Sequence, residues 1–293
     1  FKRFFGTPID KLFPAFYHAS LDYIKHEEFD NIFMVRMPIY FGDEEYIDGK
    51  TITAEEFYTR INSDSIIPTT SQPSLGETLE LYESLKAEGY TDIIHLPISK
   101  GISGVYQSLY SISDLVEGIN VHIVDTRATS VILAFIVLEC ARKVKENHTV
   151  AEVLAYSEYL SSHYNAYFMV DDLKYLIKNG RLSNAAGFIG SVLKIKPILT
   201  FNEVGEIIGI EKIRTTKKAM NHIVNKVLTE TKNYRKVKYF MAYGFEAELK
   251  NDFDNLVKDY LDIKQALRSI FPTVIGAHVG SAVIALGYFI LEE

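Results

Sequence analysis

The feature that most constrains the fold is a strand, a loop, a helix and a second strand that follow one another between residues 92 and 124. Residues 92–98 and residues 121–124 are short apolar runs typical of buried strands. A helix expected over residues 105–115 connects them, and this order is typical of a parallel βαβ unit. We therefore predict an α/β fold whose first sheet is parallel, with a ligand site at the carboxyl ends of its strands.

Polar loops follow both predicted strands, at residues 99–104 and 125–130. A third polar stretch, residues 68–74, carries four hydroxyl groups just ahead of a helix that Ser74 and Glu77 are spaced to cap. Free N–H groups at the start of a helix, together with hydroxyl groups, favour an anion. The simpler interpretation is that these hydroxyls only satisfy a turn and cap the helix. We expect the three stretches to converge.

The length of 293 residues fits one large domain or two of ordinary size. We predict two, with a boundary that separates residues 1–164 from residues 165–293. In the second part, apolar alternation on both sides of residues 202–205 predicts a β-hairpin. A net charge of −7 argues against a nucleic-acid surface, which needs a basic stripe.

Several further elements are expected from their apolar patterns. We predict helices over residues 14–26 and 183–193, and one buried strand over residues 32–41. A strand over residues 270–277 is expected to place His278 in the loop that follows it.

The motifs exclude several classes of enzyme. The sequence has no glycine-rich phosphate loop, no dinucleotide fingerprint and no histidine pair at metal-ligand spacing on a helix. The single cysteine, Cys140, lies in an apolar run and is expected to be a buried thiol. No apolar run is long enough to predict a transmembrane helix. Ser99 or Ser103 with His278 remains an open alternative as nucleophile and base.

Basic residues form two groups of interest. Arg181 follows an Asn-Gly turn, and Arg214 belongs to a basic group at the start of a predicted helix. Cations at a helix N-terminus oppose the helix dipole, which favours a role in recognition over one in stability. The alternative is that the second group is a solvated face.

Seven motifs resemble those of the DegV family in their order and spacing, over a match that runs from about Tyr46 to the C-terminus. They are TSQPS at 70–74, ISKGISGVYQS at 98–108, VDDLKYL at 170–176, GRLS at 180–183, KIKPIL at 194–199, KIR at 212–214 and GAHVG at 276–280.

This resemblance implies two α/β domains that hold a fatty acid between them. It is closest to the fatty-acid-binding subunits of the bacterial fatty acid kinase system, which present the acyl carboxylate to a separate ATP-binding kinase subunit. It thus implies a cytoplasmic, non-catalytic protein with no cofactor, involved in phospholipid synthesis, and leaves transient contact with a membrane surface open. Carried over by motif, the carboxylate would contact Thr69, Thr70, Ser71, Ser99, Gly101 and His278, with Arg181 and Arg214 near it or facing the kinase.

The sequence departs from the family pattern in three places. Residues 1–45 only distantly resemble its N-terminal motif, and Lys100 stands where a second serine is usual. Ile132 and Val283 replace small residues, which leaves the preferred acyl chain length undetermined. Two other functions stay open: an enzyme that acts on an acyl substrate through the two serines and His278, and a regulatory lipid sensor.

Overall fold

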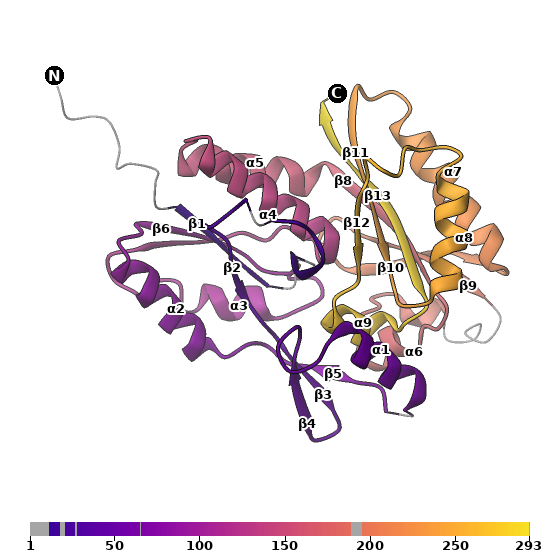
Figure 1. The fold of residues 1–293 in the computed structure, drawn as a ribbon, viewed down its shortest axis with the longest axis horizontal. Helices are drawn as coiled ribbons and strands as arrows, with labels where there is room; N and C mark the ends of the chain where they lie inside the picture. Colours follow the sequence, from indigo (N-terminus) through magenta and orange to yellow (C-terminus); the bar gives the residue numbers. More distant parts are fainter. Residues whose placement is uncertain (1–11, 18–20, 27, 65, 189–194, 293) are drawn as a thin grey trace.

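The strands of the structure form three sheets, of four, six and three strands. The four-stranded sheet lies in the N-terminal half (residues 12–163) and the six-stranded sheet in the C-terminal half (residues 164–292). Within the described residues, none of the helices combines the length and apolar character needed to cross a membrane. The computed structural model describes the following residues (Figure 1): 12–17, 21–26, 28–64, 66–188 and 195–292.

The four-stranded sheet is parallel throughout, in the order β2-β1-β6-β7. Its strands are β1 (Leu12–Tyr17), β2 (Phe33–Val35), β6 (Asp92–Leu96) and β7 (Asn120–Ile123). The helix α3 (Val105–Tyr110) connects β6 to β7, so the predicted βαβ unit is confirmed. Figure 1 shows α2 and α3 on one face of this sheet and α4 and α5 on the other. Besides α3, the helices on these two faces are α2 (Leu75–Ala87), α4 (Ser130–Lys145) and α5 (Val150–Ser162).

Two predictions for the start of the chain are wrong. Of residues 14–26, the described ones include the end of β1 and a short 3-10 helix, η1 (Leu21–Tyr23); β1 pairs on both edges with neighbouring strands. Short apolar runs fit a buried strand as well as a helix, so the pattern did not separate them. Residues 32–41 hold two strands of different sheets, β2 and β3 (Pro38–Phe41). Arg36 and Met37 lie between the two strands, and Pro38 begins β3, a position that suits proline because it cannot donate to a ladder in mid-strand.

The six-stranded sheet is mixed, in the order β10-β9-β8-β13-β11-β12, and only β11 and β12 pair in parallel. The hairpin of β9 and β10 is confirmed. Helices α7 (Thr216–Thr231) and α8 (Ala247–Val257) cover the outer face (Figure 1). The strands are β8 (Tyr164–Val170), β9 (Lys196–Phe201), β10 (Ile207–Ile213), β11 (Lys236–Tyr243), β12 (Leu267–Ile270) and β13 (Val283–Glu292).

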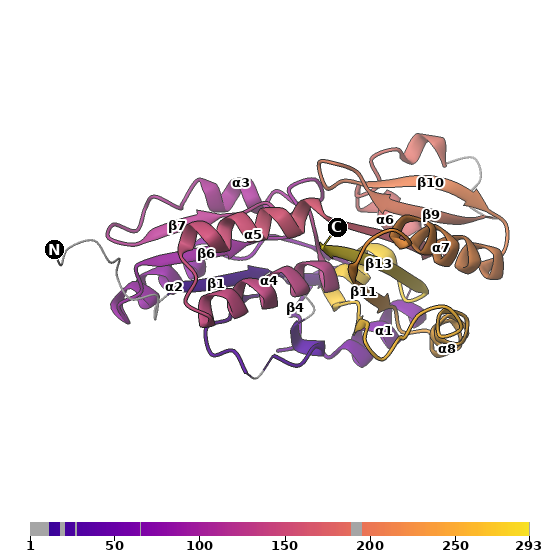
Figure 2. The same ribbon diagram turned by 90° about the horizontal axis from the view of Figure 1, so that it is seen from above.

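The two faces of this sheet belong to different cores, because side chains alternate along each strand. On β8, Tyr167 and Met169 pack with α7 and α8, whereas Ala166 and Phe168 pack with residues of the N-terminal half. α4 contacts β1 of the parallel sheet as well as β11 and β12 of the six-stranded sheet, and Figure 2 shows it alongside β1. The first turns of α4 are therefore buried on nearly all sides, and Cys140 is buried as predicted.

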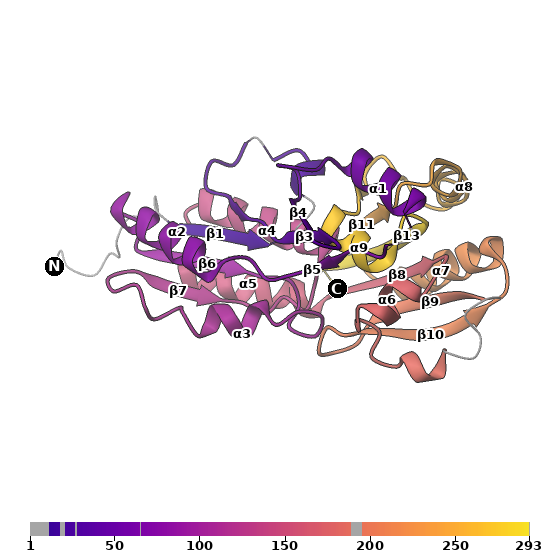
Figure 3. The ribbon, with the colours of Figure 1, turned by 90° about the horizontal axis from the view of Figure 1, so that it is seen from below.

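A three-stranded sheet, in the order β4-β3-β5, lies at the junction of the two halves with three short helices (Figure 3). The additional strands are β4 (Glu44–Ile47) and β5 (Thr69–Thr70), and the helices are α1 (Ala54–Ser63), α6 (Lys174–Lys178) and α9 (Thr273–Val279).

Two predictions for the C-terminal half are corrected. The strand predicted over residues 270–277 is wrong, because α9 occupies most of that range and includes His278. Of the helix predicted over residues 183–193, the structure has only the 3-10 helix η2 (Ala185–Gly187). The final part of the predicted helix lies outside the described residues.

Candidate functional site

His278 lies near the end of α9 and faces the loop that precedes α2. Its Nε2 atom is 2.9 Å from Oγ1 of Thr70, a hydrogen bond whose donor depends on the imidazole tautomer. These residues are 208 positions apart in the sequence, so the contact joins the two halves of the chain. Among the described residues, Nδ1 of His278 has no hydrogen-bond partner. One nitrogen of the ring is thus free to bond a ligand.

Side chains from other elements hold α9 in place. The hydroxyl of the fully buried Tyr58, on α1, donates to the carbonyl of Phe271 at 2.8 Å. The amide Nδ2 of Asn179, just after α6, donates to the carbonyl of Ala277 at 3.0 Å and to that of Pro68 at 3.3 Å. Asn179 therefore connects the helix of His278 to the strand of Thr70. The sequence analysis missed both Tyr58 and Asn179, although the Asn-Gly turn was a visible signal for the latter.

A small cavity of about 40 Å³, here called the His278 chamber, lies beside this hydrogen bond. Its polar lining comes from strand, loop and helix residues of both halves, and its apolar lining comes mainly from α9 and the loop after β6. The lining residues are Met37, Thr70, Ile98, Ile102, Ser103, Thr129, Arg181, Ile207, Val274, Ile275, His278 and Val279.

The electrostatics of this chamber favour an anion. Burial and the positive charge of Arg181 lower the pKa of His278 to about 4, so its imidazole is neutral at pH 7. The Arg181 side chain donates from Nε to the carbonyl of Ile102 at 3.1 Å and from Nη1 to that of Asn179. No ion pair within the described part of the chain involves Arg181, so an incoming anion meets an uncompensated positive charge.

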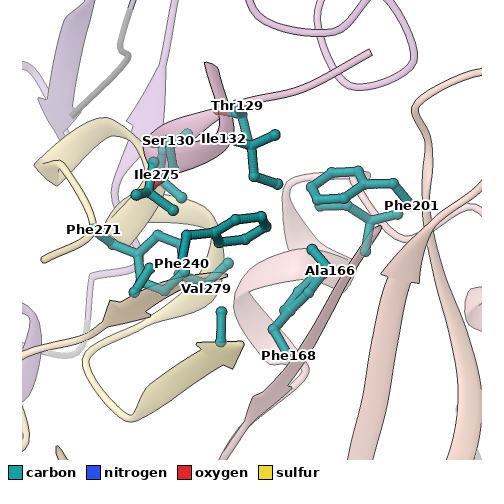
Figure 4. A pocket seen from close by; sticks show the side chains of 14 residues that line it. Thr129, Ser130, Ile132, Ala166, Phe168, Phe201, Phe240, Phe271, Ile275 and Val279 are labelled. Carbon is teal, nitrogen blue, oxygen red and sulfur yellow. The ribbon is translucent and has the colours of Figure 1, made fainter. Parts of the chain in front are cut away.

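A second cavity of about 40 Å³, the phenylalanine chamber, lies next to the first. The two share the side chains of Thr129, Ile207, Ile275 and Val279 as a common wall. The lining includes four phenylalanines, Phe168, Phe201, Phe240 and Phe271, and Figure 4 shows their rings around the second chamber together with Ile132 from the first turn of α4. The lining residues are Thr129, Ser130, Val131, Ile132, Ala166, Phe168, Phe201, Ile207, Phe240, Ala242, Phe271, Ile275, Val279 and Ala285.

The loop after β6 meets the other two polar stretches, as expected. The backbone N–H of Ser99 donates to the carbonyl of Ala128 at 2.8 Å, and Thr70, Ser103 and Thr129 share the wall of the His278 chamber. The side chain of Ser99 is buried and donates to the carbonyl of Gly205 at 2.8 Å.

Ser99 and Gly101 lie behind the residues that line the His278 chamber. The N–H of Gly101 donates to Ser99 Oγ at 3.0 Å, and neither residue lines the His278 chamber. Ser103 Oγ accepts from the N–H of Val105. Among the described residues, no hydrogen bond that we identify couples Ser99 or Ser103 to His278.

The remaining predicted site residues lie farther from the chambers. Thr69 and Ser71 are exposed on either side of Thr70, and Ser71 Oγ bonds to the carbonyl of Gln72. Arg214 is exposed at the end of β10 and lines neither chamber.

Lys100 turns away from the site. Its Nζ lies 3.4 Å from an Asp125 carboxylate oxygen, and its side chain is about half exposed, at 54%. Histidine, cysteine and acidic side chains form no cluster of three in the described ranges that could hold a metal ion.

Comparison with known proteins places these features in a family. The model of a family of uncharacterised proteins, DegV, matches residues 20–291. A DegV domain-containing protein of Staphylococcus aureus (strain COL) is 37% identical over 273 residues, 92% of this chain and 94% of the relative. A DegV domain-containing protein of Streptococcus pneumoniae is 36% identical over 259 residues, 88% of this chain and 92% of the relative.

Two solved structures are similar over nearly the whole chain. A fatty acid binding DegV family protein from Streptococcus agalactiae aligns with a TM-score of 0.88 and 28% identity, over 95% of this chain and 98% of the other. DegV from Bacillus subtilis, described as a fatty acid binding protein, aligns with a TM-score of 0.82 and 30% identity, over 96% and 99%.

Proposed function

The chain belongs to the DegV family, and on that premise we propose that it binds a long-chain fatty acid, with the carboxylate in the His278 chamber and the acyl chain in the phenylalanine chamber. The observation that carries this proposal is that the two chambers share a wall while only one of them has ionisable side chains. The two solved relatives described as fatty acid binding support the same class of ligand.

The His278 chamber suits a carboxylate. A buried carboxylate is strongly disfavoured unless charged or polar donors surround it. Thr70, Ser103, His278 and Arg181 place two hydroxyls, an imidazole and a guanidinium around one space. A bound anion would also favour protonation of His278, since an opposite charge nearby raises the pKa of a cationic group.

The phenylalanine chamber suits an acyl chain, but only after side chains move. Each buried methylene contributes about 0.8 kcal/mol, so a long chain gains enough to offset its ordering. A cavity of about 40 Å³ holds only a few water molecules. Entry of a long acyl chain therefore has to displace lining side chains, and Phe201, which is only partly buried, is the most accessible of the four rings.

The finer role that we propose is presentation of the bound carboxylate to a separate ATP-binding kinase subunit, by a cytoplasmic protein that is not itself a catalyst. The motif resemblance supports this role, with Thr69, Ser71, Ser99, Gly101 and Arg214 contributing around the carboxylate or at the kinase-facing surface. We place the boundary between its two α/β domains near residue 164, where the six-stranded sheet begins.

An enzyme that uses Ser99 or Ser103 with His278 is the second candidate, and a regulatory lipid sensor is the third. Incubation of the purified chain with ATP and a fatty acid, with and without a partner kinase, separates them. If the chain presents its ligand to the kinase, acyl phosphate should form only when the kinase is present. Turnover of an acyl substrate by the chain alone would instead support the enzyme.

Binding itself is tested by native mass spectrometry of the purified chain, followed by denaturation and identification of any released acid. Thr70→Val should lower fatty-acid affinity roughly tenfold or more, because a carboxylate loses a hydrogen bond. Thr229→Val is the matched control, since Thr229 is exposed on α7 and bonds only within that helix. A delipidated wild-type chain that takes up no added acid would contradict the proposal.

A further inference from the structure

The strands under the phenylalanine chamber form rows that lead away from His278. β13 begins just after α9, and its Val283 pairs with Val170 of β8. Farther along β13, Ala285 lies between Phe168 and Ala242, and all three line the chamber. This near row forms the part of the floor closest to α9.

The far row consists of Ala166, Gly287 and Phe240, from β8, β13 and β11. A Cβ atom added to Gly287 would lie 2.2 Å from Cζ of Phe240, so the phenylalanine ring occupies the space above the glycine. Phe240 is buried, with 1% exposure, and it lines the chamber (Figure 4). Gly287 lies between Ala166 and Phe240, so the Phe240 ring is the one large side chain among these three residues.

The next row lies beyond Phe240, outside the lining of the chamber. Phe289 pairs with Tyr164, and its ring centroid lies 5.5 Å from that of Phe240 and 5.7 Å from that of Tyr164. Phe135, one turn after Ile132 on α4, approaches Phe289 to 4.5 Å between centroids. These four aromatic residues, here called the aromatic plug, come from both halves of the chain.

We infer that the aromatic plug is the stop for the methyl end of the acyl chain and that Phe240 sets the longest acid that fits. This inference rests on the proposed function. An extended strand spans about 13 Å from Val283 to Gly287, where the Phe240 ring lies, and about 20 Å from Val283 to Phe289, which is the length scale of an extended long-chain acyl group. An acid longer than the distance from His278 to the plug would have to fold back or displace a buried ring.

The test compares affinities of the delipidated protein for straight-chain saturated acids from dodecanoic to eicosanoic acid. Phe240→Ala should move the longest well-bound acid to greater length, each newly accommodated methylene raising affinity about fourfold. Ala166→Val adds bulk to the same row and should move the limit to shorter acids. If Phe240→Ala fails to fold, Phe240→Leu gives the same test, because it keeps most of the buried volume. The longest well-bound acid should then lengthen by less.

Phe253→Leu is the matched control, because Phe253 is fully buried on α8 in the core behind the other face of the sheet. It should leave the length profile unchanged. If the Phe240 variants bind acids with the wild-type length profile, the aromatic plug is not the stop for the acyl chain, while the proposal of fatty-acid binding stays intact. A wild-type protein that binds none of the acids would instead overturn the proposed function, and this inference with it.

Discussion

His278 combines a hydrogen bond to Thr70 with a pKa lowered to about 4, well below the usual value near 6.5. Between these two values the unfolded chain binds a proton that the folded chain does not. The contribution of His278 to the unfolding free energy is therefore fully present above about pH 6.5 and is lost as the pH is lowered towards 4.

We predict that His278→Gln removes part of this pH dependence. Lowering the pH from 7 to 5 should reduce the unfolding free energy of the ligand-free wild type by about 1–2 kcal/mol more than that of the variant. Urea unfolding of both proteins at the two pH values measures the difference. His95 has a pKa of about 3 through burial and is present in both proteins, so it cancels in the comparison. Identical pH slopes would show that His278 is not held neutral by its surroundings.

The sequence could identify the loops of the site more readily than the direction of each side chain. Thr70 and His278 belong to quoted motifs, and the structure brings them into contact. Thr69 and Ser71 belong to the same stretch as Thr70 but are exposed, because neighbours on an extended chain point to opposite sides. Which of them faces inward depends on how β5 pairs with β3, and that pairing is not encoded in local spacing.

Among the structural elements, α9 is one that the apolar pattern assigned wrongly. Six of its seven residues are buried, so it lacks the polar face from which an amphipathic helix is identified. The hairpin of β9 and β10 could be predicted because turn residues separate two alternating runs. The core face of a buried helix, in contrast, is known only when its neighbours are known.

Asn179 is expected to act on the ligand site through α9 and β5. Asn179→Ala removes both of its hydrogen bonds, to the carbonyls of Ala277 and Pro68. Leaving these carbonyls without the Asn179 donor should lower the unfolding free energy by about 1–3 kcal/mol. It should also weaken fatty-acid binding, because α9 and β5 lose the connection through Asn179. Chemical unfolding and acid titration measure the two effects.

The control for this prediction is Asn221→Ala. The Asn221 amide donates to the carbonyl of Lys217 on α7, which lies on the outer face of the six-stranded sheet. It should leave acid affinity unchanged. Equal affinities in both variants would mean that the position of α9 does not depend on Asn179.

At the scale of the whole molecule, the turn between β9 and β10 fits into the N-terminal half. Gly205 has a φ of +79°, and its carbonyl accepts the Ser99 hydroxyl bond. A Cβ atom at Gly205 would lie 2.0 Å from Ser99 Oγ and 2.9 Å from the Cα of Arg127. Two residues beyond these contacts, Thr129 and Ile207 line both chambers. The fit of this turn therefore fixes the width of the site.

Gly205→Ala is accordingly predicted to reduce both stability and fatty-acid affinity, because the added methyl group forces the turn away from the N-terminal half. Gly42→Ala separates this effect from backbone strain, since Gly42 has a similar φ of +62° but no atom within 4 Å of an added Cβ. Gly205→Ala should lower the unfolding free energy by about 1–3 kcal/mol more than Gly42→Ala, and only Gly205→Ala should weaken acid binding. Equal losses in both variants would mean that the two halves tolerate separation at this turn, and the chambers would then owe their shape to α9 and α4 instead.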